Sequence, residues 1–361
     1  MNQEERINAV FEGRKPDRLP WFADLVFWYF GMRKRGELPP QYYDPVPLRG
    51  GVYGEGRVRL YKDLGCGAHE ELNDGTEITT YRFITPLGEL ERVWKFTMDG
   101  MSTALVKYPV QNAKDLKILR YILKDAKIRV DENLYELQRR WMEQWKGIGI
   151  VSSLAPRAPM SALFVEWMGV KNTSILYFKE REEIEETLKV LDESYDPYFE
   201  SIENAPARYV YFGDNLSGDV VNPRFFQKYY LPYYRKRVSK LHQKEKVVYV
   251  HIDGALKGIL SRIRETEIDC AQALTPAPVG DLELERFREE AGEEVILWGG
   301  LPGVYFSRRY SQELLENMVM KVIEHYLHDG KFIVGVADQV PPDADIRRVR
   351  MVTEIIEENP L

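Results

Sequence analysis

Cysteine is scarce in this sequence, with Cys66 and Cys270 the two in 361 residues. This number excludes a disulfide framework and is typical of a reducing compartment. Long hydrophobic runs are also missing: no apolar run reaches the roughly 18 residues that a membrane-spanning helix needs. The opening segment, residues 1–18, is charged and lacks the apolar core of a secretory signal. These absences predict a cytoplasmic protein without a membrane span.

Positive charge is in the minority, because 50 Lys and Arg residues stand against 57 Asp and Glu residues, for a net charge of −7. A surface of this sign repels phosphate backbones, so we expect no nucleic-acid partner. A Gly-rich phosphate-binding fingerprint is absent after every apolar run. This absence argues against the open, doubly wound sheet of dinucleotide-binding proteins.

Short apolar runs alternate with longer segments of helical periodicity through most of the chain. The runs are continuous, which is typical of parallel strands that are buried on both faces. Strands that alternate with helices form a parallel sheet with helices outside. We therefore predict an α/β fold, a (β/α)8 TIM barrel that spans residues 1–361 as a single domain. The predicted strands are 18–24, 65–72, 147–153, 209–215, 246–254, 269–276, 294–300 and 331–338.

Capping signals place several of the helices between these strands. Asn222 followed by Pro223 predicts the start of one helix, with Asn as the N-cap and Pro in the first turn. Gly280 and Asp281 predict the start of another, which ends before Gly292. A third helix is expected over residues 311–328.

Residues 75–112 interrupt the alternation of strands and helices. This segment alternates polar and apolar residues and contains a Pro-Leu-Gly turn. The pattern predicts an antiparallel hairpin inserted between elements of the barrel. Such a hairpin could act as a flap over the site.

Polar side chains recur where the predicted strands end. Catalysis in α/β barrels takes place at the carboxyl ends of the strands, so side chains at these positions converge on one mouth. Carboxylates that are crowded together raise one another's pKa, which suits acid–base chemistry or cation binding. The candidate site residues are Asp24, Asp214, Asn215, His251, Asp253 and Asp338.

Each of these residues also has a purely structural interpretation. An Asp after a strand is often the N-cap of the next helix. For Asp24 the sequence favours neither the N-cap nor the site interpretation over the other. A His beside an apolar run is usually a core residue. However, His251 and Asp253 are two positions apart on one extended strand, so they point the same way and form a plausible ligand or acid–base pair.

Several motifs occur along nearly the whole chain: R-x-x-A-x-x-x-G-x-x-P-D-R-x-P (6–20), TPLG (85–88), GDN (213–215), HIDG (251–254), LTPAPVGDLE (274–283), WGG (298–300) and ADQVPPDAD (337–345). Together they resemble the uroporphyrinogen decarboxylase-like superfamily, which includes corrinoid-dependent methyltransferases. The resemblance implies the same barrel.

The segment after the first predicted strand departs from the porphyrinogen decarboxylases of this superfamily. Those enzymes carry Arg-Gln-Ala-Gly-Arg there, and its arginines bind substrate carboxylates. Residues 25–36 of this chain instead contain the aromatic run 27–30, with Arg33 and Arg35 nearby. A tetrapyrrole with many carboxylates would need an arginine cluster, so we expect an apolar pocket for a small organic substrate.

The thiol methyltransferases of the superfamily bind zinc through His-x-Cys and a distant Cys. The resemblance carries this pattern over to His251, Asp253 and Asp338, which implies a divalent metal, possibly zinc, on harder ligands. The loss of both thiolates puts thiol activation in doubt and leaves a methyl donor with an oxygen or nitrogen leaving group. The alternative is a hydrogen-bonded imidazolium–carboxylate cluster without metal.

The resemblance implies methyl transfer that involves a corrinoid carrier. The sequence contains no corrinoid-binding domain, so the corrinoid is expected on a partner protein. His251, Asp253 and Asp338 would polarise the leaving group, while Asp214 and Asn215 would orient the substrate. Cofactor-free decarboxylation is the first alternative, and a non-catalytic barrel that binds a small molecule is the second.

Overall fold

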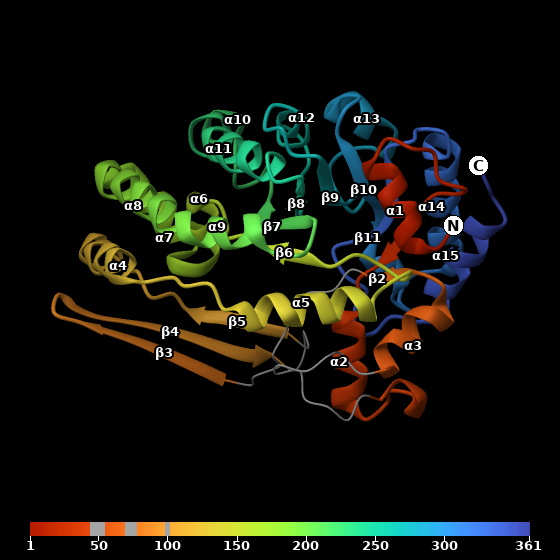
Figure 1. Ribbon diagram of the computed structural model, residues 1–361, viewed down its shortest axis with the longest axis horizontal. Helices are drawn as coiled ribbons and strands as arrows, with labels where there is room; N and C mark the ends of the chain where they lie inside the picture. The colour runs from red at the N-terminus through yellow and green to blue at the C-terminus, as the bar shows by residue number, and fades with distance from the viewer. Residues whose placement is uncertain (44–54, 69–77, 98–101) are drawn as a thin grey trace.

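The computed structural model describes residues 1–43, 55–68, 78–97 and 102–361. Its centre is an eight-stranded, wholly parallel sheet with the order β2-β1-β11-β10-β9-β8-β7-β6. The sheet is curled and has helices outside it (Figure 1). Its strands are β1 (Trp21–Ala23), β2 (Gly67–Ala68), β6 (Ser152–Leu154), β7 (Tyr209–Leu216), β8 (Val247–Ile252), β9 (Cys270–Leu274), β10 (Ile296–Pro302) and β11 (Phe332–Ala337).

Each of the eight predicted runs overlaps one of these strands, which confirms the α/β class and the parallel sheet. Strands β8 to β11 are buried along their whole length, as continuous apolar runs require. The outermost strands, β2 and β6, are short. Among the described residues, one isolated parallel bridge, from Ala68 to Gly149, joins the two ends of the sheet.

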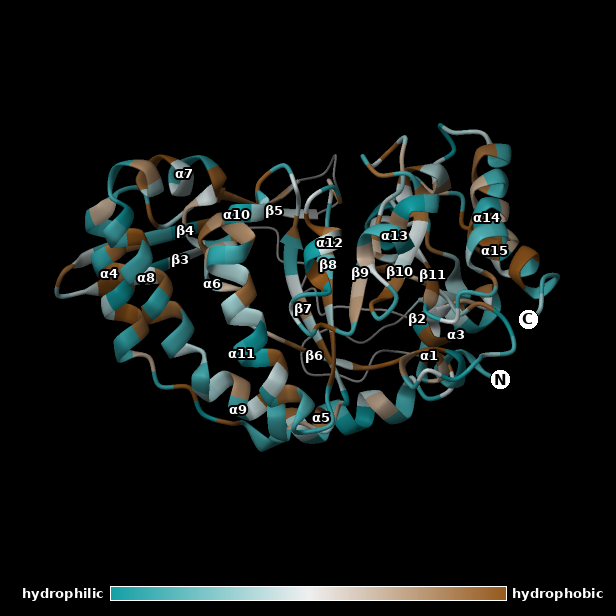
Figure 2. Cartoon of the chain, turned by 90° about the horizontal axis from the view of Figure 1, so that it is seen from above, coloured by the Kyte–Doolittle hydropathy of each residue, from teal (hydrophilic) through white to brown (hydrophobic). Residues whose placement is uncertain are grey.

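The helices lie between successive strands, as the sequence pattern predicts. The long ones are amphipathic: in α14 the buried residues Leu315, Met318, Val319, Val322 and Ile323 recur at the spacing of one helix face. Figure 2 shows this as mixed teal and brown along α14 and α15. The helices are α1 (Gln3–Phe11), α2 (Val26–Arg35), η1 (Pro40–Tyr42), α3 (Glu55–Leu64), α4 (Ala113–Asp125), α5 (Glu132–Gln144), α6 (Pro159–Ala162), η2 (Leu163–Trp167), α7 (Gly169–Lys179), α8 (Arg181–Ser194), α9 (Asp196–Asn204), α10 (Pro223–Phe225), η3 (Phe226–Tyr230), α11 (Leu231–His242), α12 (Leu260–Ile263), η4 (Leu284–Arg286), α13 (Phe287–Ala291), η5 (Gly303–Phe306), α14 (Gln312–Tyr326) and α15 (Arg347–Glu357).

Two of the three predicted helices are confirmed, and the third is confirmed at its end, since α13 stops before Gly292, but not at its start. Asn222 caps α10, because its side chain accepts a hydrogen bond from the backbone N–H of Phe225. The predicted third helix is α14. Asp281 does not start a helix: its carboxylate accepts the N–H of Leu256 at 2.7 Å, and the next helical residue is Leu284.

Large aromatic side chains fill the interior of the curled sheet below its carboxyl end. The ring centroid of Trp298 lies 5.4 Å from that of Phe22 and 5.6 Å from that of Tyr249, which in turn lies 5.0 Å from Tyr211. Gly335 on β11 leaves room for this packing, since a Cβ there would approach the Trp298 indole to 2.7 Å. The aromatic cluster therefore forms a packed layer beneath the carboxyl ends of the strands.

The predicted insertion is an antiparallel sheet of three strands, β3 (Ile78–Thr85), β4 (Gly88–Thr97) and β5 (Ser102–Lys107). Residues 75–77 and 98–101 of the predicted range lie outside the described residues. The sheet runs beside α4 (Figure 1) and buries Leu90. Phe83 lies against Trp167 with ring centroids 6.0 Å apart.

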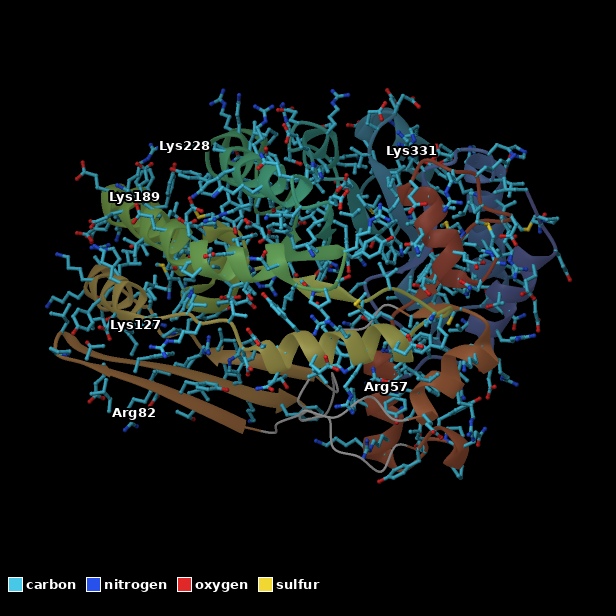
Figure 3. All side chains as sticks on the ribbon, viewed as in Figure 1. Arg57, Arg82, Lys127, Lys189, Lys228 and Lys331 are labelled. Carbon is cyan, nitrogen blue, oxygen red and sulfur yellow. The ribbon has the colours of Figure 1, made fainter. Side chains whose placement is uncertain are left out.

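Basic side chains are distributed around the outside of the molecule. Arg82, Lys189, Lys228 and Lys331 lie well apart at its edge in Figure 3. Lys228 and Lys331 each reach a carboxylate, on Glu185 at 2.6 Å and on Glu294 at 2.8 Å. Within the described parts of the chain, none of the helices has the length and hydropathy needed to cross a membrane.

Candidate functional site

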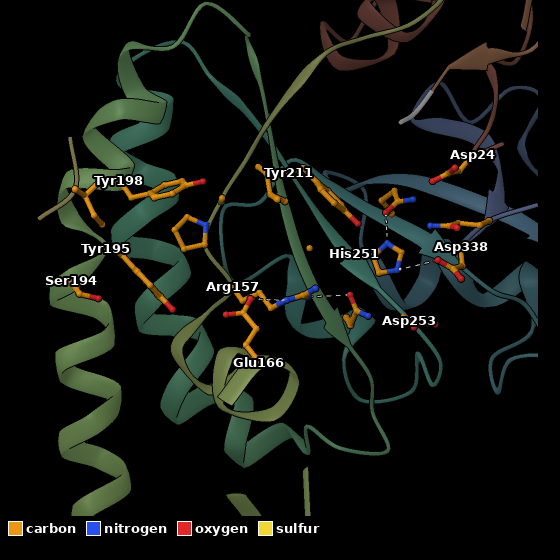
Figure 4. Close-up of a pocket in the computed structure, with 18 of the residues that line it drawn as sticks. Asp24, Arg157, Glu166, Ser194, Tyr195, Tyr198, Tyr211, His251, Asp253 and Asp338 are labelled. Atoms are coloured by element: carbon orange, nitrogen blue, oxygen red, sulfur yellow. Dashed lines mark hydrogen bonds and ion pairs between the residues drawn. The ribbon is translucent and has the colours of Figure 1, made fainter. Parts of the chain in front are cut away.

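A cavity of about 580 Å³ lies at the carboxyl end of the curled sheet. One part of its wall is polar and comes from the ends of five strands. The other part is formed by the loop after β6 and by residues around α4, α8 and α9, which include Tyr195 and Tyr198 (Figure 4). The polar part consists of Asp24, Asn215, His251, Asp253, Gln272 and Asp338, with Gln339 beside it.

His251, on β8, is the centre of the polar part and is 6% exposed. Its Nδ1 lies 2.7 Å from Oε1 of Gln272 on β9, and its Nε2 lies 3.8 Å from Oδ1 of Asp338 (Figure 4). An amide oxygen can only accept, so this assignment of the amide makes Nδ1 the donor and directs Nε2 toward Asp338. The Tyr211 ring meets the imidazole edge-on, at a centroid distance of 6.1 Å. The imidazole is thus held on two sides.

Asp338 and Asn215 both have left-handed backbone conformations, with φ of +69° and +49°. Asp and Asn tolerate this region better than other side-chain-bearing residues because their short polar groups bond locally. Both positions follow or end a strand at the cavity. Backbone strain of this kind gathers at functional sites, where it aims a side chain.

Asp24 and Asp253 line the same cavity in different ways. Asp24 is 6% exposed and its Oδ1 accepts the N–H of Val26, the first residue of α2, at 2.8 Å. The N-cap position itself is Leu25, so Asp24 precedes the cap that one of its two interpretations predicted. Asp253 is exposed just beyond the end of β8, on the same side as His251. The structure therefore brings together five of the six predicted residues at one cavity.

Asp214 is the exception, because it is 1% exposed and is not among the residues that line the cavity. Burial raises the pKa of its carboxyl, although hydrogen bonds act against the rise. The carboxylate accepts the Tyr234 hydroxyl at 2.5 Å and the N–H of Ala158 at 2.6 Å. Asp214 thus fixes the loop after β6 and does not face the cavity. Its position on an apolar strand did not show which of these two sides it would face.

The arrangement does not match the metal site that the resemblance implies. Among the residues that the structure describes, no three or more His, Cys, Asp or Glu side chains are grouped so as to hold a metal ion. His251 and Asp338 approach each other, but Nδ1 of His251 already forms a hydrogen bond with Gln272. The geometry fits the alternative better, an imidazole–carboxylate pair without metal.

The loop after β6 contributes Arg157, which the sequence analysis did not single out. Its Nη1 donates to Oδ1 of Asn215 at 3.2 Å, and its Nε lies 3.3 Å from Oε1 of Glu166 on η2 (Figure 4). Burial raises the pKa of Glu166, although Arg157 opposes the rise and 36% of the side chain is exposed. An arginine at the end of a predicted strand, in Ala-Pro-Arg-Ala-Pro, was the available signal.

The aromatic run 27–30 reaches the cavity through Phe27 alone. Trp28 and Tyr29 are buried in the core, where the Tyr29 hydroxyl donates to the carbonyl of Tyr42 at 2.9 Å. Arg33 and Arg35 do not line the cavity: Arg33 lies over the Tyr43 ring, and Arg35 donates to the carbonyl of Pro342. The described wall therefore contains no arginine cluster.

The family model described as uroporphyrinogen decarboxylase (URO-D) matches residues 110–359, more than half of the chain. A solved methyltransferase from Methanosarcina mazei superposes with a TM-score of 0.67 at 13% identity, over 99% of both chains. An octameric ribulose-1,5-bisphosphate carboxylase/oxygenase from Pyrococcus horikoshii OT3 gives a TM-score of 0.28 at 9% identity, over 63% of this chain and 47% of the other. No curated protein matches by sequence.

Proposed function

The chain belongs to the uroporphyrinogen decarboxylase (URO-D) family, and on that premise we propose that it is a (β/α)8-barrel enzyme that transfers a methyl group from a small organic substrate to a corrinoid on a partner protein. The observation that carries the proposal is the His251–Asp338 pair in a small cavity without an arginine cluster. The fold shared with the M. mazei methyltransferase is consistent with it.

The size of the cavity supports a small substrate. About 580 Å³ is within the range of pockets for drug-sized ligands, roughly 300–1,000 Å³. A corrinoid macrocycle is far larger than such a ligand, so it would approach the mouth from outside as the methyl acceptor. When bound, the corrinoid would supply the nucleophile; the residues of this chain would prepare the leaving group.

In this proposal His251 acts as the general acid. When a methyl–oxygen or methyl–nitrogen bond breaks, the leaving atom gains an electron pair and needs a proton. Gln272 holds Nδ1, so the proton that an imidazolium can release is on Nε2, on the side of Asp338. The Asp338 carboxylate lies beside Nε2, and Asn215 and Asp253 line the same wall for contacts with the substrate.

Decarboxylation of a porphyrinogen is the second candidate, since the family is described by that activity. The carboxylates Asp24, Asp253 and Asp338 favour it in one respect, because they would stabilise a protonated intermediate. The substrate carries many carboxylates, however, and the described wall offers Arg157 as its only arginine or lysine. Methyl transfer therefore fits the site better.

The test uses the purified full-length chain and free cob(I)alamin in place of the partner-bound corrinoid. A panel of methoxy, N-methyl and S-methyl compounds is screened for methylcobalamin by its absorbance. We expect a product from a methoxy or N-methyl compound, and His251→Gln should lower its rate by about 10²- to 10⁴-fold. His242→Gln is the matched control, because His242 also pairs with a carboxylate, that of Asp269 at 3.0 Å, and does not line the cavity.

A further inference from the structure

Arg157 is the only arginine or lysine among the described residues that line the cavity. It stands between Pro156 and Ala158 in a loop with little backbone freedom, because Pro156 and Pro159 each fix one φ. The hydrogen bond from the Ala158 N–H to the buried Asp214 carboxylate anchors the same loop. The guanidinium is therefore presented to the cavity by a rigid support.

The guanidinium offers a ligand its Nη2 nitrogen. Its Nη1 donates to Asn215, and its Nε faces Glu166. Among the described residues, Nη2 donates to no protein group, and 25% of the side chain is exposed. A guanidinium binds a carboxylate through parallel N–H donors, and such charge-assisted bonds are about twice as strong as neutral ones.

Charge is distributed unevenly along the cavity. The carboxylates of Asp24, Asp253 and Asp338 share the wall with His251, whereas Arg157 lies beside Glu166 (Figure 4). An anionic group on a ligand is repelled by the three aspartates and attracted by Arg157. A ligand with a single carboxylate would therefore bind in one orientation.

We propose that the substrate is a small methylated carboxylic acid, whose carboxylate binds Arg157 while its methyl-bearing atom lies at His251. The inference rests on the proposed methyl transfer and names its substrate class. Tyr211 lines the cavity and meets His251 edge-on, so it offers an apolar surface to the body of the substrate. Glu166 is the internal counter-ion that holds Arg157 when no carboxylate is bound.

Matched pairs of acid and amide isolate the role of charge. Isothermal titration calorimetry compares each of 2-, 3- and 4-methoxybenzoate and methoxyacetate with the corresponding neutral amide. We expect at least one acid to bind on the order of 10- to 100-fold more tightly than its amide, as loss of a charge-assisted bond predicts. If every acid binds no better than its amide, the inference is wrong.

Variants of the pair make the test specific. Arg157→Met should remove the preference for the acid without changing the affinity for the amide, and Arg157→Lys should restore part of it. Glu166→Gln should strengthen binding of the acid, because it removes the internal competitor; weaker binding would contradict the proposal. Arg181→Met is the matched control, since Arg181 pairs with Glu185 at 2.8 Å on the surface of α8 and should leave every affinity unchanged.

The two proposals fail in different ways. If the acid binds through Arg157 but no methyl group reaches cob(I)alamin, the carboxylate inference stands and the proposed function is wrong. If methylcobalamin forms equally well from acid and amide, with an unchanged KM in Arg157→Met, methyl transfer stands and the carboxylate inference is wrong.

Discussion

Nε2 of His251 lies 3.8 Å from Oδ1 of Asp338, although 86 intervening residues separate the two in the sequence. The contact is possible because β8 and β11 belong to one curled sheet, in the order β11-β10-β9-β8, and the ends of both strands reach the same cavity. Asp338 reaches inward from a left-handed backbone, with φ of +69°. The Asp338 carboxylate thus lies on the side of the ring, at Nε2, from which His251 would donate to a leaving group.

Asp338→Asn should lower kcat by about fivefold. Asp338 is half-exposed, so its contact with His251 is worth about 1 kcal/mol, or roughly fivefold in rate. Steady-state rates with the best methyl donor measure this effect. Asn also tolerates a positive φ, whereas Asp338→Ala should lose about a further 1 kcal/mol of folding free energy to backbone strain. Equal stability of the two variants by urea unfolding would contradict the role of the backbone.

Removal of divalent metal should leave the activity intact. The described residues contain no grouping of three metal-ligating side chains, and His251 engages Gln272 and Asp338 instead. Purified protein is treated with a chelator, its metal content is measured by mass spectrometry, and its rate is compared with the untreated sample. One equivalent of bound zinc that is lost in Asp338→Ala, together with the activity, would restore the metal hypothesis.

Gly335→Ala should destabilise the fold by about 1–3 kcal/mol, the usual cost of overpacking. A Cβ at this position would approach the Trp298 indole to 2.7 Å, in the aromatic cluster beneath the site. Thermal unfolding measures the loss. The double variant with Trp298→Phe should recover part of the stability, because the smaller ring leaves room for the methyl group. If the double variant recovers no stability, the strain does not arise from contact with Trp298.

His242 should contribute stability at low pH that disappears at high pH. The hydrogen bond that Nε2 of His242 donates to the Asp269 carboxylate raises the pKa of His242 in the folded state, so the folded protein binds the proton more tightly than the unfolded chain. The stabilisation is complete below the unfolded pKa, near 6.5, and is lost as the pH rises through the higher folded value. Urea unfolding of wild type and His242→Gln should therefore differ at about pH 5.5 and converge at about pH 9. If the difference in unfolding free energy between the two proteins grows with pH, the pKa of His242 is not raised by folding.

The sequence predicted the sheet because strands buried on both faces must be continuously apolar, and β8 to β11 are. It also located His251, Asp253 and Asp338, because polar residues at strand ends converge at one mouth. It could not place Asp214, since the alternation along a strand puts Asp214 and Asn215 on opposite faces without telling which face meets the cavity. In this chain Tyr234 supplies a buried partner on the helix side.

Other parts of the site depend on contacts that a single sequence does not show. Gln272 lies on β9 within an apolar run, and its role follows only from its position beside Nδ1 of His251. Arg157 and Glu166 meet because the loop after β6 turns back over η2. The expected flap is likewise not observed: the described residues of β3, β4 and β5 lie beside α4 and contribute none of the residues that line the cavity.

The fate of a doubly labelled substrate tests the central claim most directly. The chain is incubated with cob(I)alamin and 4-methoxybenzoate, or the best-binding acid of the panel, labelled with deuterium in the methyl group and with ¹³C in the carboxyl group. Mass spectrometry should find the deuterated methyl group on cobalamin and the ¹³C carboxyl group retained in the demethylated acid, with both changes lost in His251→Gln. Release of ¹³CO₂ with the methyl group still on the substrate would contradict methyl transfer and identify the enzyme as a decarboxylase.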